Sequence, residues 1–175
     1  TPGENSTSVG YKNVATGSNS SAFGFQNFSD GDYSSAIGFN NTSSGEYSSA
    51  VGSENKATDG QASAFGHANE ATGYESSAFG AYNEAPADFG NAYGYSNQAN
   101  GEESNAFGNL NEADGDFSSA FGYDNRAIEE GSNAFGYGNQ ANGAYSIALG
   151  AENQANADYS VAIGYQAVST EENTV

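Results

Sequence analysis

Large apolar residues recur along this chain at one fixed interval, each framed by small residues. The phrase "SSAFG" at residues 20–24 returns fourteen residues later as "SSAIG", and then as "SSAVG". Its closing glycine falls at every fourteenth residue from Gly10 to Gly164, without insertion or deletion. A fixed short period of this kind predicts one structural coil per repeat, with each coil stacked on the next.

We number the positions of the repeat from this glycine, which is position 0, and call the residues that share a position a column. Position −2 is Ala in every copy but the first, position +5 is always Ala or Ser, and position +7 is most often Gly. Fourteen residues are too few for a pair of helices, and Gly, Asn and Ser are poor helix formers. Two short strands joined by two tight turns fit the repeat, with Gly and Asn supplying positive φ at the corners.

The sequence therefore predicts an all-β fold, a narrow β-solenoid of about twelve 14-residue coils with two short strands in each coil. The repeats place this solenoid at residues 8–168, after a lead-in at residues 1–7. Residues 169–175 depart from the repeat and are expected to begin a separate segment.

Strand side chains alternate between two faces, so the positions that share a face can be read from the repeat. Positions −4, −2 and 0 hold Ser, Ala and Gly, and positions +3, +5 and +7 hold Asn, Ala and Gly. These small residues are expected to line a thin interior, in which stacked asparagines form a hydrogen-bonded ladder. The expected ladder consists of Asn13, Asn27, Asn41, Asn55, Asn69, Asn83, Asn97, Asn111, Asn125, Asn139 and Asn153. The outer positions +2, +4 and +6 are mostly polar and are expected to be solvated.

The outer face of the first strand is strongly aromatic. Of the 23 aromatic residues, 20 fall in the columns −5, −1 and +1. A continuous aromatic wall exceeds the few hundred Å² that a monomer usually exposes, and identical chains around a shared axis would cover it. Column −1 is the expected core of that oligomer: Phe23, Ile37, Val51, Phe65, Phe79, Tyr93, Phe107, Phe121, Phe135, Leu149 and Ile163. The alternative, in which these side chains point into the coil interior, stays open.

The repeat resembles the head domains of YadA-like trimeric autotransporter adhesins. The phrase "SVAIG" at residues 160–164 and the "ATG" at residues 15–17 and 71–73 are typical of that family's repeat. The closing "STEENTV" resembles the neck that follows such heads. The resemblance implies a left-handed parallel β-roll assembled as a homotrimer, with column −1 as the trimer core. It also implies a place on the bacterial cell surface, anchored in the outer membrane through a C-terminal region outside this sequence. Half of the copies here carry Phe where the family phrase has Ile or Val.

Composition narrows the possible partners. The chain holds 22 acidic and 3 basic residues, a formal net charge of −19, which argues against binding to nucleic acid or to anionic membranes. It has no cysteine, so disulfides and thiolate metal sites are excluded. No stretch approaches the roughly 20 apolar residues of a membrane span, and we expect no direct membrane insertion.

The sequence offers little for catalysis, and we expect neither an enzyme nor a cofactor. His67 occupies a +1 position and is expected at the surface or at the rim of the core. The many serines sit in columns with no base to activate them. Column +8 holds Asp32, Glu46, Asp88, Glu102, Asp116, Glu130 and Asp158. Such carboxylates can bind Ca²⁺, but one per coil supplies few ligands, so a solvated edge is expected and no metal site is assigned.

The expected function is attachment by a rigid trimeric head to host, matrix, prey or abiotic surfaces, through an extracellular protein or carbohydrate ligand. The alternative is a structural spacer or self-assembling filament segment without a ligand of its own. A binding head should show a place where side chains break the repeat. Three aromatic residues stray from the three columns, Phe28, Tyr74 and Tyr82. A ligand patch is predicted at Tyr74, Tyr82 and Pro86.

Overall fold

A computed structural model describes residues 2–172 and divides the chain into two compact units, Thr1–Phe89 and Gly90–Val175. Each 14-residue repeat forms one coil with a five-residue strand at positions −3 to +1 and a two-residue strand at positions +4 and +5. Over the described residues there are twelve coils, six in each unit, so the expected all-β parallel β-solenoid is confirmed.

Unit 1 contains strands β1 to β12. Its long strands are β1 (Thr7–Tyr11), β3 (Ser21–Phe25), β5 (Ser35–Phe39), β7 (Ser49–Ser53), β9 (Ser63–His67) and β11 (Ser77–Ala81). Its short strands are β2 (Val14–Ala15), β4 (Phe28–Ser29), β6 (Thr42–Ser43), β8 (Lys56–Ala57), β10 (Glu70–Ala71) and β12 (Glu84–Ala85).

Unit 2 repeats this arrangement with strands β13 to β24. Its long strands are β13 (Asn91–Tyr95), β15 (Asn105–Asn109), β17 (Ser119–Tyr123), β19 (Asn133–Tyr137), β21 (Ile147–Ala151) and β23 (Val161–Tyr165). Its short strands are β14 (Gln98–Ala99), β16 (Glu112–Ala113), β18 (Arg126–Ala127), β20 (Gln140–Ala141), β22 (Gln154–Ala155) and β24 (Val168–Ser169). Of the expected segment 169–175, Ser169 ends β24, and residues 173–175 lie outside the described residues.

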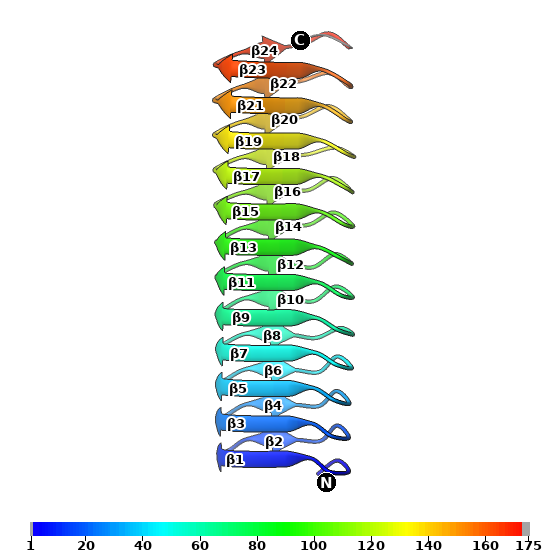
Figure 1. The fold of residues 1–175 in the computed structure, drawn as a ribbon, viewed down its shortest axis with the longest axis vertical. Coiled ribbons are helices and arrows are strands. Elements are labelled where there is room, and N and C mark those ends of the chain that lie inside the picture. The colour runs from blue at the N-terminus through cyan, green and yellow to red at the C-terminus, as the bar shows by residue number, and fades with distance from the viewer. Residues whose placement is uncertain (1, 173–175) are drawn as a thin grey trace. The chain divides into compact units, whose positions relative to one another are not determined.

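Within each unit, long strands pair in parallel with long strands and short with short. The register never shifts: Phe107 lies beside Phe121, and Ala113 beside Ala127. Residues of one column therefore stack directly over one another. In Figure 1 the long strands of each unit run in front from right to left and the short strands return behind them as the chain rises, which is the expected left-handed winding.

The interior of each coil is built almost entirely from small side chains. Ser118, Ala120, Asn125 and Ala127, at positions −4, −2, +3 and +5, are fully buried, as are most of their equivalents. Alternation along the strands predicts these four columns correctly. It fails at position 0, because Gly122 and its equivalents, next to the last residue of each long strand, have φ between 117° and 125° and none of them is buried.

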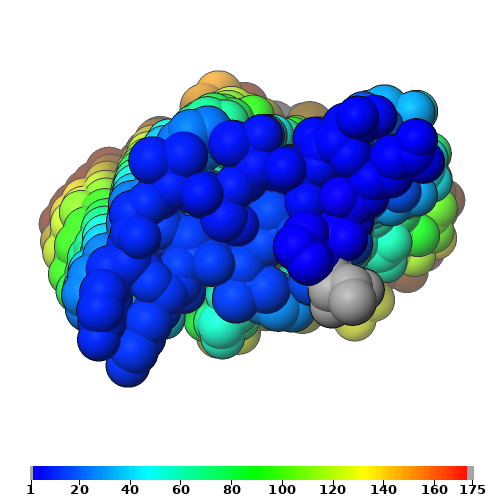
Figure 2. Space-filling model, turned by 90° about the horizontal axis from the view of Figure 1, so that it is seen from below, coloured from blue at the N-terminus to red at the C-terminus, as the bar shows by residue number. Residues whose placement is uncertain are grey.

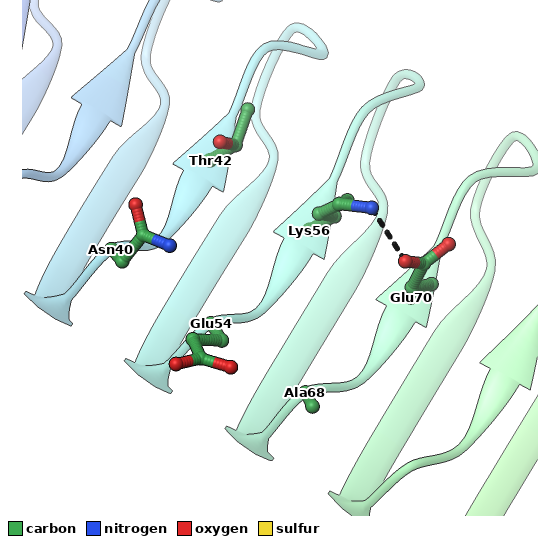
Figure 3. Close-up of a pocket in the computed structure, with 6 residues that line it drawn as sticks. All are labelled: Asn40, Thr42, Glu54, Lys56, Ala68 and Glu70. Carbon is green, nitrogen blue, oxygen red and sulfur yellow. Dashed lines mark hydrogen bonds and ion pairs between the residues drawn. The ribbon is translucent and has the colours of Figure 1, made fainter.

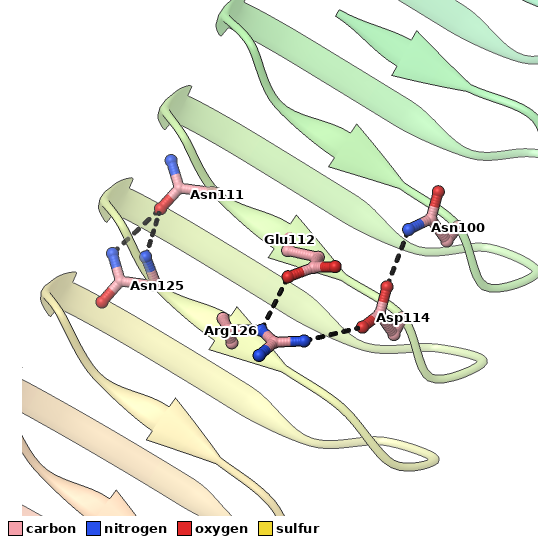
Figure 4. Close-up of polar contacts among 6 residues, drawn as sticks. All are labelled: Asn100, Asn111, Glu112, Asp114, Asn125 and Arg126. Carbon is pink, nitrogen blue, oxygen red and sulfur yellow. Dashed lines mark hydrogen bonds and ion pairs between the residues drawn. The ribbon is translucent and has the colours of Figure 1, made fainter.

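The asparagine column links successive coils through side-chain amides. The backbone N–H and the side-chain Nδ2 of Asn125 both donate to Oδ1 of Asn111, at 3.2 and 3.0 Å (Figure 4). The same Nδ2 also donates to the backbone oxygens of Phe121 and Gly136, at 3.1 and 2.8 Å. The buried amide thus has partners for all its groups, as a polar group in an interior requires.

The corners differ from the expectation that Gly and Asn would supply positive φ. Position 0 does so, but the asparagines at +3 do not, and the left-handed positions are +2 and −5. These hold many residue types, including Tyr33 at 59° and Phe117 at 59°. Their backbone N–H groups donate to the preceding coil, as from Tyr33 to the oxygen of Ser18 at 2.8 Å. Hydrogen bonds between stacked coils therefore stabilise a positive φ at these two positions, although most of the residue types found there disfavour it.

Candidate functional site

The large residues of column −1 lie on the outside of the coils. Val9, Ile37, Leu149 and Ile163 expose between 40% and 55% of their surface. Where aromatic members follow one another in the column, their rings stack, as those of Phe65 and Phe79 do at 4.8 Å. In unit 2 the rings of Phe107 and Phe121 are parallel within 2°, with centroids 4.8 Å apart. The alternative of an apolar interior is therefore wrong, because the coil is too thin for any side chain larger than asparagine.

Column +1 forms a second stacked row on the same strands. In unit 1 the centroid distances are 5.1 Å from Tyr11 to Phe25 and 5.5 Å from Phe25 to Phe39. In unit 2 Tyr123 stacks on Tyr137 at 5.4 Å. We call the −1 and +1 side chains of the long strands the aromatic strip. Its side chains are exposed or half-buried in a single chain, and none is fully buried.

Column −5 does not belong to this strip, which corrects the expectation of one wall made from three columns. The long strand begins only at −3, and the −5 residue lies in the wide turn that leads into it. Tyr33 and Tyr47 stack there at 4.9 Å, and Tyr145 and Tyr159 at 5.4 Å. The positive φ at −5 interrupts strand alternation, so counting by twos cannot cross it.

Two tyrosines of the wide turns have altered acidity. A hydrogen bond from the Tyr145 hydroxyl to the Glu130 carboxylate raises the pKa of Tyr145 above its ordinary value. The carboxylate of Glu75 likewise raises the pKa of Tyr74, mainly through a hydrogen bond, while the hydrogen bond from Gln61 lowers it. In both cases the neighbouring negative charge favours the neutral phenol.

The acidic column +8 has a role in the wide turn. Oδ1 of Asp88 accepts a hydrogen bond from the backbone N–H of Tyr74, one coil earlier, at 2.9 Å. Asp116 accepts one from Glu102 in the same way, also at 2.9 Å. These carboxylates therefore satisfy backbone donors at the turn. Within residues 2–172, no three His, Cys, Asp or Glu side chains are grouped so as to hold a metal ion.

The predicted ligand patch is not a single patch. Tyr74 lies in a wide turn, edge-on to Phe89 at 5.8 Å, and Pro86 belongs to the next wide turn. Tyr82 lies at a narrow turn, where its hydroxyl is 3.1 Å from Nε2 of His67. The two tyrosines therefore occupy opposite corners of the coils. The spacing of Tyr74 and Tyr82 in the sequence cannot reveal that they lie at different corners, because their placement depends on where each turn falls within the repeat.

A hollow of about 300 Å³ opens on the outer face of the short strands in unit 1, between columns +2 and +4 (Figure 3). The residues that line it are Asn40, Thr42, Glu54, Lys56, Ala68 and Glu70. Nζ of Lys56 lies 2.6 Å from Oε1 of Glu70, one coil away. Sequence reasoning missed this site, although Lys56 is one of only three basic residues in the chain.

Unit 2 has a hollow of about 320 Å³ between the same two columns. It is lined by Ser96, Gln98, Leu110, Asn111, Glu112 and Asp124. Beside it, Nε of Arg126 lies 2.6 Å from Oε2 of Glu112, and Nη2 of Arg126 lies 3.8 Å from Oδ2 of Asp114 (Figure 4). The two units thus each carry a cross-coil ion pair in column +4.

A third hollow opens at the first coil, where Pro2, Ser8 and Thr16 are among its lining residues. Figure 2 looks onto this end of unit 1, and the blue atoms of the first coil form the face that is seen. Ser8 is exposed here, whereas Ala22, which follows it in column −2, is fully buried. The hollow is thus the open end of the small-residue interior.

Among the residues that the structure describes, none belongs to a helix long and apolar enough to cross a membrane.

The comparisons with known proteins agree with the geometry. The family model described as the YadA head domain repeat (2 copies) matches residues 2–27, 29–55, 57–83, 99–125, 127–153, 141–167 and 155–175. No curated protein matches the chain. Because the matched segments together cover most of the chain, and because the fold is a parallel β-solenoid of 14-residue coils, this protein belongs to the YadA head domain family.

Proposed function

We propose that this chain is the head of a bacterial surface adhesin and that it works as a homotrimer. The observation that carries the proposal is the distribution of charge. None of the 22 acidic and 3 basic residues lies in a long strand, while these strands present the aromatic strip. Depletion of charge around exposed aromatic side chains is typical of the core of a protein interface.

Three copies around one axis would bury three strips against one another. Full burial of a large apolar side chain contributes about 2 kcal/mol, and the strip supplies one or two such residues per coil. In a closed symmetric assembly every copy has its strip covered by its neighbours, and no strip is left exposed. Membership of the YadA head family supports a trimer over other closed assemblies.

Attachment is the activity that this arrangement serves best. A trimer repeats each outer surface three times, so weak contacts to host, matrix, prey or abiotic surfaces gain by avidity. The family places such heads on the outside of bacterial cells, anchored in the outer membrane through another part of the protein. Binding and display account for the fold without a catalytic step.

Light scattering of the purified chain, with and without changes in the strip, tests the assembly. We expect the mass of three chains for the unaltered protein and of one chain for Phe107→Ser/Phe121→Ser. Phe28→Thr is the matched control, because Phe28 is exposed to the same degree as Phe121, 38% against 36%, but lies on a short strand. This control should keep the trimer.

A monomeric unaltered chain would overturn the trimer. If the double variant unfolds by circular dichroism, Tyr123→Asn/Tyr137→Asn replaces it, because Asn109 already occupies column +1. A trimer unchanged by that pair as well would show that the strip is not the interface. A mass that grows steadily with concentration would favour a filament segment instead.

A further inference from the structure

The hollow in unit 1 differs from the rest of the outer surface in the side chains that surround it. Column +2 supplies Asn40, Glu54 and Ala68, and column +4 supplies Thr42, Lys56 and Glu70. Ala68 ends at Cβ where the preceding coil carries the longer Glu54, so space is left between the two columns. Figure 3 shows these polar groups along both sides of the hollow.

Aromatic residues occupy the coils on either side of this hollow, in the same two columns. Phe28 is the register partner of Thr42 in column +4 and is 38% exposed. Tyr82 follows Ala68 in column +2 and is 49% exposed. Its backbone N–H donates to the oxygen of His67 at 3.0 Å, which places it one coil beyond Ala68. Two of the three aromatic residues that depart from the repeat therefore lie in the coils that adjoin one hollow, Tyr82 with its hydroxyl beside His67.

The polar groups of the hollow nearly balance in charge. The ammonium of Lys56 is paired with the carboxylate of Glu70. The hollow therefore keeps one net negative charge, that of Glu54. Asn40 and Thr42 add an amide and a hydroxyl, each of which can donate and accept hydrogen bonds. A ligand with many hydroxyl groups matches such mixed donors and acceptors, and the apolar face of a sugar ring matches an exposed aromatic ring.

We propose that this hollow binds one or two sugar residues of a neutral glycan, and that this glycan is a ligand of the head. The inference rests on the proposed adhesin function and names the chemical class of its ligand. The volume of the hollow, about 300 Å³, is at the small end for ligand sites and suits a ligand of one or two sugar residues. A net charge of −19 disfavours sulfated or otherwise anionic glycans.

The hollow of unit 2 provides an internal comparison. It has an equivalent cross-coil ion pair, here between Glu112 and Arg126, but Asp124 takes the place that Ala68 has in unit 1. The repeat that follows carries Gly138 in column +2 and Gln140 in column +4, so this hollow lacks an aromatic ring at the position that Tyr82 holds after the hollow of unit 1. We expect the glycan to bind in unit 1 and not here.

Calorimetry and saturation-transfer NMR on the assembled protein test the site. The probes are cellotetraose, chitotetraose, mannotetraose and lacto-N-tetraose, with a heparin tetrasaccharide and a lysine octapeptide as charged comparisons. Tyr82→Ser and Lys56→Gln should each weaken binding of the neutral saccharide at least about tenfold. Both substitutions are already present elsewhere in these columns, as Ser96 and Gln98, so the fold should tolerate them. Arg126→Gln is the matched control and should leave binding unchanged.

The proposal is overturned if none of the neutral saccharides binds, or if Tyr82→Ser and Lys56→Gln bind as the unaltered protein does. Binding of the lysine peptide alone would assign the surface to a cationic partner and would overturn it too. Lys56 and Tyr82 lie in columns +4 and +2, outside the aromatic strip, and Tyr82 meets the strip only at His67, so light scattering should still give a trimer. Loss of saccharide binding with the trimer intact would locate the ligand site, whereas a monomeric unaltered protein would contradict the assembly and not the glycan site.

Discussion

At the scale of single residues, the interior is unusual in what its polar side chains do. The asparagines find partners in each of the eleven coils that carry one, but the buried serines of column −4 divide into two groups. Ser34 and Ser48 lie 2.6 and 2.7 Å from the hydroxyls of Ser29 and Ser43, which occupy column +5. Within residues 2–172, seven buried hydroxyls of column −4 have no hydrogen-bond partner: Ser20, Ser76, Ser104, Ser118, Ser132, Ser146 and Ser160. These serines face Ala instead of Ser across the coil.

The two groups should respond oppositely to loss of the hydroxyl. Ser118→Ala removes a buried group that has no partner, so the free energy of unfolding should stay the same or rise by up to about 1 kcal/mol. Ser34→Ala leaves the buried hydroxyl of Ser29 without its partner and should lower the free energy of unfolding by about 1–3 kcal/mol. Ala62 already fills this column and is fully buried, so alanine fits. Urea unfolding followed by circular dichroism compares the two variants, and equal losses would contradict the distinction.

At the scale of the strands and turns, the repeat specifies the strands more strictly than the corners. Each long strand ends with a glycine at φ near 120° followed by one more residue, and a Cβ on Gly122 would lie 2.1 Å from the backbone oxygen of Gly136. Position +2 also has positive φ but is open: a Cβ on Gly138 would lie 3.7 Å from its nearest neighbour, a carbon of the Glu152 side chain. The two corner positions therefore differ in what they accept.

We expect Gly122→Ala to destabilise the protein severely, by more than about 4 kcal/mol, because it combines a forbidden φ with a clash against the next coil. Gly138→Asn should be neutral or slightly stabilising, because Asn40 adopts φ of 52° at the same position and glycine is the more flexible residue when unfolded. Thermal unfolding of both variants is the measurement. A stable Gly122→Ala protein would show that the long strand can end differently.

The elements also show where prediction by alternation stops. The spacing of Ala and Asn correctly placed the interior columns, because a strand alternates strictly. The same counting put Tyr33 and Phe117 on the aromatic wall, whereas the positive φ of these residues places them in the wide turn. It also grouped Tyr74 with Tyr82, which lie at different corners.

At the scale of the whole molecule, charge and apolar surface are separated by position in the repeat. Sixteen of the 22 acidic residues fall at positions +6 to −5, which form the wide turns, and none of the basic residues does. Parallel stacking sets these carboxylates one above another along each unit. Their mutual repulsion opposes folding, and dissolved salt screens it.

The unfolding temperature should therefore rise as sodium chloride is increased from low concentration to that of sea water. Glu102→Gln/Glu103→Gln removes two adjacent negative charges from a wide turn and should make this dependence weaker. Differential scanning calorimetry of both proteins over a salt series gives the comparison. An unfolding temperature that is independent of salt, or equal slopes for the two proteins, would contradict a destabilising role of the acidic edge.

The sequence by itself determined the coil, its length and its interior, because a 14-residue period without insertions admits only identical stacked units, and only small side chains fit between two closely spaced strands. It also indicated the family. The tertiary structure alone decided which residues leave the strand at each corner, that the Asp88 carboxylate accepts a turn N–H, and that Lys56 meets Glu70 beside a hollow. These contacts join side chains one coil apart, and their direction depends on positive φ values that no spacing along the chain reveals.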